Sequence, residues 1–156
     1  MKEKWKSLLV ALAIPLAVGG LGALLSGGMS DYGAMVKPPL SPPGWVFPVV
    51  WSVLYLAMGL ASWLVWKTEA PVHRKRRALI LYGAQLAVNF IWPLIFFGAE
   101  MYLTALVVLV ILWVLILLTI RAFSEINERA GDLLIPYILW VSFAAYLNLG
   151  IFLLNR

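Results

Sequence analysis

The chain has 156 residues, of which 63% are hydrophobic and only 12% are charged, and its net charge is +5. A soluble globular protein is roughly half apolar and about a quarter charged, so this composition excludes a soluble domain as well as a disordered chain. Cysteine is absent, which excludes disulfides, thiol catalysis and cysteine-ligated metals, and a polytopic membrane protein is the class that fits.

Apolar stretches long enough to cross a bilayer occur five times. A crossing takes about 20 apolar residues, and helices are favoured because lipid offers the backbone no hydrogen-bond partner. The first stretch follows three lysines and resembles a secretory signal, but its length favours a retained span. We expect residues 1–156 to form one all-α membrane domain, a bundle of five transmembrane helices. The expected spans are residues 7–25, 45–66, 78–98, 101–120 and 133–154.

The loop between the first two spans differs from the others. Residues 27–44 carry almost no charge and contain Pro38, Pro39, Pro42 and Pro43. Proline fixes φ and restricts the residue before it, so this segment should be ordered. We expect a lid over the adjacent helix ends.

Basic residues gather on one side of the predicted bundle. The N-terminus, the second loop and the fourth loop share a side, and only Lys37 and Arg156 of the 12 Lys and Arg lie on the other. The positive-inside rule therefore predicts a protein of the cell membrane with a cytoplasmic N-terminus and an outside C-terminus. An orientation anchor that can touch anionic lipid explains the basic cluster at residues 74–77 better than a nucleic-acid site does.

The predicted spans contain no Asp, Glu, Lys, Arg or His. Ion pumps and proton-coupled exporters need ionisable groups at depth, so active transport lacks its usual machinery. His73 is the only histidine and lies among arginines, outside the spans. Metal sites, haem ligation, acid–base catalysis and Ser–His catalysis therefore have no candidates. We expect no metal and no required cofactor.

Aromatic rings are the distinctive side chains of the spans. Tryptophans near span ends fit an interfacial belt, whereas Trp51, Trp92 and Trp140 lie deeper. Helical spacing puts Trp51 on a face with Tyr55, Asn89 on one with Trp92, and Trp140 beside small residues that leave room for a flat guest. Ligand pockets are mostly apolar with a few polar groups, although interhelical hydrogen bonding is the more frequent role of a buried Asn. The candidate ligand-binding residues are Tyr32 and Pro42 of the lid, and Trp51, Tyr55, Asn89, Phe90, Trp92, Trp140, Phe143, Ala144, Leu147 and Asn148 of the spans.

Three motifs resemble those of the tryptophan-rich sensory protein / translocator protein family (TspO/MBR), which includes the peripheral-type benzodiazepine receptor. They are KPPLSPPGWVFPVVWSVLY at 37–55, NFIWPLIFF at 89–97 and PYILWVSFAAYLN at 136–148. The resemblance implies a five-helix bundle, usually dimeric, with a cavity beneath the first loop. It also implies binding of protoporphyrin IX and of isoquinoline carboxamide and benzodiazepine-type drugs. Some members promote light-dependent porphyrin degradation, in which tryptophans matching Trp51 and Trp140 are implicated.

Animal members of that family also bind cholesterol, and their fifth span ends in a Leu/Val–Tyr–Arg/Lys motif. In this sequence Leu149 and Leu153 occupy the positions of its Tyr and Arg, and Tyr146 is too far from Arg156 to replace them. Cholesterol is therefore not expected as the natural ligand.

The leading hypothesis is a membrane protein that presents Trp51 and Trp140 to a tetrapyrrole, with light-driven porphyrin loss at these indoles as its chemistry. A facilitated transporter of tetrapyrroles and a ligand-responsive sensor without chemistry are the alternatives. The resemblance implies a homodimer. Gly83, Ala84 and Ala87 form a stripe that permits close helix approach, although packing inside the bundle explains the stripe equally well.

Overall fold

The computed structural model describes residues 2–27 and 32–156, and over these residues the chain is helical and contains no strand. The first helix, α1, is followed by a short 3₁₀ turn, η1, and then by the remaining helices. The elements are α1 (Lys2–Leu25), η1 (Tyr32–Ala34), α2 (Val46–Lys67), α3 (Val72–Pro93), the π-helical turn η2 (Leu94–Gly98), α4 (Tyr102–Ile126), α5 (Glu128–Leu133) and α6 (Ile135–Leu154).

The five expected spans are confirmed. Among the described residues, five helical segments are long and apolar enough to cross a membrane, and each contains one predicted span to within a residue. The helices extend beyond the predictions at charged ends, since α1 begins at Lys2, α3 begins at Val72 and α4 continues to Ile126. Long basic side chains at helix ends reach the interface while their backbone stays helical, so hydropathy alone places these ends too far inside.

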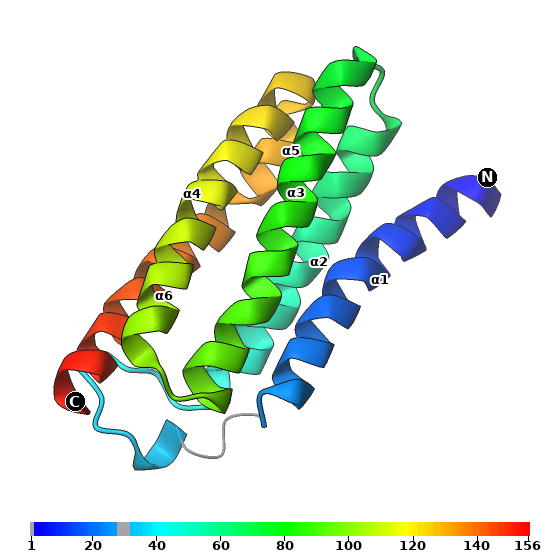
Figure 1. Cartoon of the computed structure of the whole chain (residues 1–156). Coiled ribbons are helices and arrows are strands. Elements are labelled where there is room, and N and C mark those ends of the chain that lie inside the picture. Colours follow the sequence, from blue (N-terminus) through cyan, green and yellow to red (C-terminus); the bar gives the residue numbers. More distant parts are fainter. Residues whose placement is uncertain (1, 28–31) are drawn as a thin grey trace.

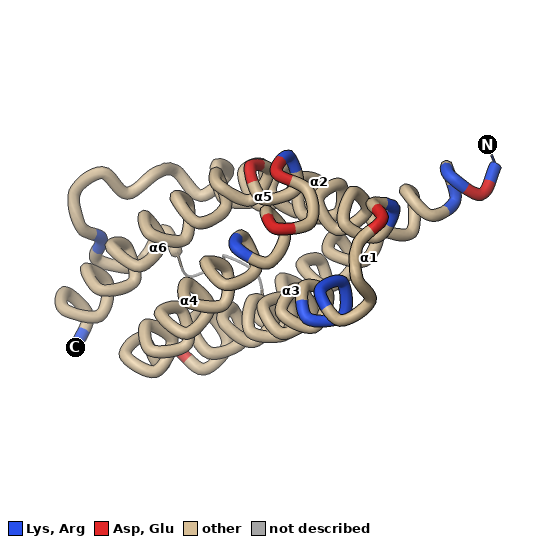
Figure 2. Tube along the Cα trace, turned by 90° about the horizontal axis from the view of Figure 1, so that it is seen from above, with Lys and Arg blue, Asp and Glu red and all other residues tan. Residues whose placement is uncertain are grey.

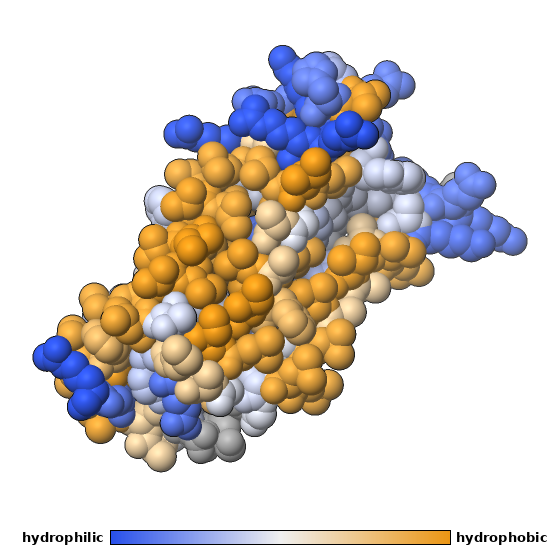
Figure 3. Space-filling view, viewed as in Figure 1, coloured by the Kyte–Doolittle hydropathy of each residue, from blue (hydrophilic) through white to orange (hydrophobic). Residues whose placement is uncertain are grey.

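Successive membrane-spanning segments run in opposite directions, with α5 and α6 forming one segment (Figure 1). The start of α1, the α2–α3 connection and the α4–α5 connection lie at one end, and the first loop, the α3–α4 turn and the C-terminus lie at the other. Lys and Arg gather at the first of these ends, as Figure 2 shows. An apolar band separates the two polar ends in Figure 3, as a bilayer environment requires.

The core lies between α2, α3, α4 and α6, where Met58, Ile116 and Tyr137 are fully or almost fully buried. Helix α1 packs on α2 and α3. At the α1–α2 crossing, a Cβ on Gly59 would lie 2.6 Å from the carbonyl oxygen of Ala11, so only glycine permits this close approach.

A proline shapes the end of the third span that lies nearer the first loop. Pro93 ends α3 and lacks an N–H, and the helix continues as the wider turn η2, in which the N–H of Ala99 donates to the carbonyl of Leu94 over 2.9 Å. The turn places Phe97 beside the residues of α3. This local distortion therefore adds an aromatic ring next to the end of α3.

The fifth span has one irregular turn near its start, at Leu134. The side chain of Asn127 caps α5 by accepting a hydrogen bond from the N–H of Arg129 over 3.0 Å. Leu134 separates α5 from α6, and Pro136 lies in the first turn of α6, where proline is tolerated.

Side-chain and backbone contacts hold the described part of the first loop. The ammonium of Lys37 donates to the carbonyl of Tyr32 over 2.9 Å, and Asn155 of the C-terminus bonds both the N–H and the carbonyl of Val36. Pro38 packs against Gly150 of α6, where a Cβ would lie 2.5 Å from the proline ring. Residues 28–31 of the expected lid lie outside the described residues.

Candidate ligand-binding site

A cavity of about 360 Å³ lies between α1, α2 and α3, toward the end of the bundle that carries the first loop. Small residues form its α1 wall, and aromatic rings dominate the walls from α2, α3 and η2. The lining residues are Gly19, Ala23 and Ser26 of α1, Gly44 of the loop, Phe47, Pro48, Trp51 and Tyr55 of α2, Asn89, Trp92 and Pro93 of α3, and Phe97 of η2.

Indole rings from two helices face this cavity. Trp51 of α2 stacks on Tyr55 one turn further along, with 5.5 Å between ring centroids. Trp92 of α3 stacks on Phe96 at 5.0 Å and meets Phe97 edge to face at 5.9 Å. Each indole is thus held by a neighbouring ring, and both contribute to one aromatic wall.

The polar groups of the wall are fixed by hydrogen bonds between helices. Tyr55 donates to the side-chain oxygen of Asn89 over 2.9 Å, and the Asn89 amide donates to the hydroxyl of Tyr137 over 2.7 Å. The Tyr137 hydroxyl donates in turn to Gln85 over 2.7 Å. This chain joins α2, α3 and α6 and orients Tyr55 and Asn89, while the amide nitrogen of Gln85 at its end is buried without a partner among the described residues.

The two indole N–H groups differ. That of Trp92 donates to the side-chain oxygen of Asn148 over 3.1 Å, and the Asn148 amide donates to the carbonyl of Tyr102. That of Trp51 has no hydrogen-bond partner among the described residues. The Trp92 ring is therefore held in place by its hydrogen bond, whereas the N–H group of Trp51 remains free to donate.

The α1 wall was not predicted from the sequence. A Cβ on Gly19 would clash with the ring of Tyr55, so glycine at this position lets Tyr55 reach Asn89. The hydroxyl of Ser26 donates to the carbonyl of Ala23 over 2.9 Å, which satisfies it locally. The run of small residues at the end of α1 was the available signal.

Of the predicted span residues, Trp51, Tyr55, Asn89 and Trp92 line the cavity. Two other predicted residues, Asn148 and Phe90, lie near the cavity without lining it. Asn148 is buried and holds Trp92. Phe90 faces α1, with its ring 3.5 Å from a Cβ placed on Gly22, and is not among the lining residues.

The structure does not bring Trp140 to the cavity with Trp51. Phe47 stands between them, lining the cavity and meeting Trp140 edge to face at 5.7 Å. Trp140 and Phe143 line a separate apolar groove of about 510 Å³ between α2 and α6. Trp51 and Val50 are adjacent on α2, so their side chains point in different directions around the helix. Trp51 lines the cavity, whereas Val50 lines the groove that contains Trp140.

The space expected beside Trp140 on α6 is filled. Ala144 is 7% exposed and Leu147 is 4% exposed, and both lie in the packed interior, with Ala144 part of the main core. Neither lines the cavity. Small size at Ala144 serves close packing with neighbouring helices rather than a hollow.

The two predicted lid residues are not among those that line the cavity. Tyr32 donates to the carbonyl of Pro42 over 2.7 Å and packs edge to face on Phe47 at 5.1 Å, so both residues hold the loop one layer behind the cavity wall. Burial raises the pKa of the Tyr32 phenol, which stays neutral as a donor. Gly44 is the lining residue from the described part of the loop.

No charged side chain is found among the described residues that line the cavity. Its chemistry is therefore that of aromatic faces, one free indole donor and a positioned Tyr–Asn pair. Such a surface suits a flat, largely apolar guest with few polar atoms.

Comparison with known proteins gives consistent matches. The sequence profile described as the TspO/MBR family matches residues 11–154. The Tryptophan-rich protein TspO of Chlorobaculum tepidum is 38% identical, with 99% of each chain covered. The Tryptophan-rich sensory protein of Cereibacter sphaeroides is 37% identical over 99% of this chain and 95% of its own. The Translocator protein of Ovis aries is 35% identical over 95% of this chain and 89% of its own.

Proposed function

The chain belongs to the TspO/MBR family of membrane proteins, and from this premise we propose that its cavity binds a tetrapyrrole such as protoporphyrin IX. The observation that carries the proposal is that Trp51 and Trp92, from separate helices, line one apolar cavity. Aromatic faces stack on a planar π-system, and each such contact adds about 0.5–1.5 kcal/mol beyond the area term.

The size of the cavity limits how a macrocycle enters. About 360 Å³ lies at the small end of the volumes that hold ligands, which run from about 300 to 1,000 Å³. An edge of the ring would fit between the small residues of α1 and the aromatic wall. The propionates would stay at the mouth, because burying a carboxylate without a partner is costly.

Light-dependent loss of the bound porphyrin is the second part of the proposal. An excited porphyrin takes one electron from an adjacent indole, which gives a porphyrin radical anion and an indole radical cation. Dioxygen then forms a C–O bond to the reduced ring, and return of the electron to the indole leaves a peroxide of the porphyrin, so the net change is addition of O2 to the macrocycle with the indole restored. Trp51 is the indole with direct access to the cavity, and Trp140 lies behind Phe47. We therefore assign the first electron to Trp51 and a secondary part to Trp140.

Isoquinoline carboxamide and benzodiazepine-type drugs are proposed to use the same cavity. They combine aromatic rings with an amide carbonyl, and the free indole donor of Trp51 can bind an amide oxygen. Titration of the purified protein with protoporphyrin IX in the dark, followed by tryptophan fluorescence, tests both statements. We expect saturable quenching that an isoquinoline carboxamide reverses. Quenching without saturation would refute the cavity assignment.

A homodimer in the cell membrane, with the N-terminus in the cytoplasm, completes the proposal. Gly83 and Ala87 are exposed on α3, and a Cβ on Gly83 would meet no atom within 4 Å. Packing inside the bundle therefore does not account for these two small residues. They support close approach of a second copy along α3.

A further inference from the structure

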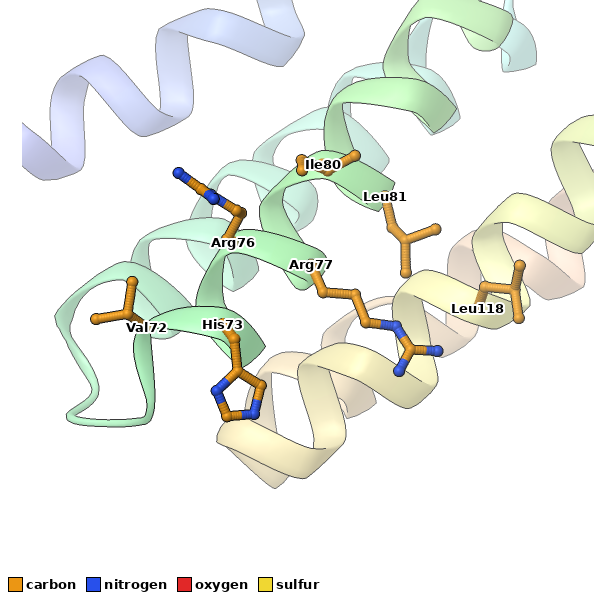
Figure 4. Close-up of a pocket in the computed structure, with 7 residues that line it drawn as sticks. All are labelled: Val72, His73, Arg76, Arg77, Ile80, Leu81 and Leu118. Atoms are coloured by element: carbon orange, nitrogen blue, oxygen red, sulfur yellow. The ribbon is translucent and has the colours of Figure 1, made fainter.

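A second depression, of about 640 Å³, lies at the opposite end of the bundle, where the start of α3 meets α4 (Figure 4). One part of it is basic and the other part is apolar. The basic part consists of His73, Arg76 and Arg77, with Val72 beside them, and the apolar part consists of Ile80, Leu81 and Leu118.

Helical spacing stacks these two parts. Arg76 lies one turn before Ile80, and Arg77 lies one turn before Leu81. In Figure 4 the side chain of Arg77 extends toward α4, where Leu118 lies, and Arg76 extends from another side of α3. A molecule in the depression would meet charge at one end and hydrocarbon along the rest of its length.

The basic side chains of the depression have no partner within the described part of the protein. Among the described residues, neither His73 nor Arg76 nor Arg77 makes an ion pair or a side-chain hydrogen bond. Lys75, in the same segment, differs because its ammonium donates to the carbonyl of Trp66 over 2.8 Å. No acidic residue is found among the described residues that line the depression. The positive charge there is available to an external anion.

The depression also straddles the membrane boundary. The basic segment ends at Arg77, and the apolar part of α3 begins at the next residue. Ile80 is 63% exposed and Leu118 is 37% exposed, so both present hydrocarbon to the surroundings of the bundle. Free phosphate would satisfy the cations and leave this apolar wall uncovered.

We propose that this depression binds one anionic phospholipid from the adjacent leaflet. Its phosphate binds the guanidinium group of Arg77, whose planar fork matches phosphate oxygens, and His73, one turn away on the same face of α3, closes the site. Arg76 adds positive charge from another side of the helix. An acyl chain runs down over Leu81 and Leu118. Basic depressions between transmembrane helices at this level recognise anionic headgroups in this way. The site shares no residue with the aromatic cavity, so it stands independently of the tetrapyrrole proposal.

The test is lipid retention by the purified full-length protein, measured by native mass spectrometry. The protein is offered equal amounts of dioleoylphosphatidylglycerol and dioleoylphosphatidylcholine. We expect the unaltered chain to retain the glycerol lipid preferentially, and the R76Q/R77Q variant to lose that preference by about tenfold or more. The charge-matched R74Q/R129Q variant, altered outside the depression, should keep it. An equal loss of lipid preference in both variants would mean that the overall positive charge attracts the lipid, and would overturn the assignment of a specific site.

Two further measurements distinguish a bound lipid from free phosphate and from charge attraction alone. Inorganic phosphate should fail to displace the bound glycerol lipid, and displacement at equal concentration would assign the site to free phosphate instead. Leu118→Trp fills the apolar part and leaves every charge in place, so it should also abolish the preference. If the R76Q/R77Q variant does not fold, Leu118→Trp is sufficient as a test. An unchanged lipid preference in Leu118→Trp would overturn the proposal.

Discussion

The hydroxyl of Tyr55 on α2 donates to the side-chain oxygen of Asn89 on α3 over 2.9 Å, and both residues line the aromatic cavity. The bond fixes the ring on which Trp51 stacks. It exists because Gly19 of α1 leaves room for the Tyr55 ring. Helices α1, α2 and α3 therefore determine the shape of the aromatic wall together.

Gly19→Ala should displace the Tyr55 ring and break its bond to Asn89. Overpacking of this kind costs about 1–3 kcal/mol of stability, and the affinity for protoporphyrin IX should fall because the wall is deformed. Thermal unfolding and fluorescence titration measure the two effects. Gly20→Ala is the matched control, since a Cβ there meets no atom within 4 Å. Equal effects of the two substitutions would contradict the role assigned to Gly19.

Asn148→Leu should release the Trp92 indole, because Asn148 provides the acceptor for its N–H. Interhelical hydrogen bonds in membranes contribute about 0.6 kcal/mol on average and about 1.7 kcal/mol at most. We expect a loss of stability in this range together with weaker porphyrin binding. Ser142→Ala removes the acceptor of the Trp113 N–H, which lies away from the cavity, and should leave binding unchanged. Weaker binding in that control would argue against a specific role for Trp92.

Trp51→Phe should slow the illuminated loss of protoporphyrin fluorescence several-fold while much of the dark binding remains. Trp140→Phe should slow it less, since Phe47 separates Trp140 from the cavity. Trp113→Phe serves as a control for general oxidation of tryptophan. The decay rate under constant light, at matched occupancy, is the measurement. A larger effect from Trp140 than from Trp51 would reverse the assignment.

Gly59→Ala should weaken the α1–α2 crossing, because the added carbon would press on the backbone at Ala11, 2.6 Å away. The backbone has little freedom to yield, so we expect a destabilisation of about 1–3 kcal/mol. Reversible unfolding in mixed detergent measures it. A melting temperature equal to that of Gly20→Ala would show that α1 adjusts freely.

The spans and half of the aromatic wall could be predicted from sequence because they depend on local pattern. Hydropathy defines the five crossings, and spacing within one helix aligns Trp51 with Tyr55 and Asn89 with Trp92. These alignments within one helix hold whichever helix packs beside it. They therefore required no knowledge of how the bundle packs.

The remaining parts of the site depend on contacts between distant segments. Whether Trp140 turns toward the cavity is set by the rotation of α6 against α2, which spacing within α6 does not determine. The wall from Gly19 and Ala23 contains no polar or aromatic group that marks it as functional. Tyr32 was expected to contact ligand, but its hydroxyl bonds to Pro42 within the loop.

The most direct test is to fill the cavity. Ala23 lines it from α1, and Leu24, the next residue, is 79% exposed on the outside of the same helix. In dark fluorescence titrations with protoporphyrin IX, Ala23→Phe should weaken saturable quenching by about tenfold or more, whereas Leu24→Phe should leave it unchanged. Equal affinity in the two variants would mean that the pigment binds elsewhere, and would contradict binding in the space between Trp51 and Trp92.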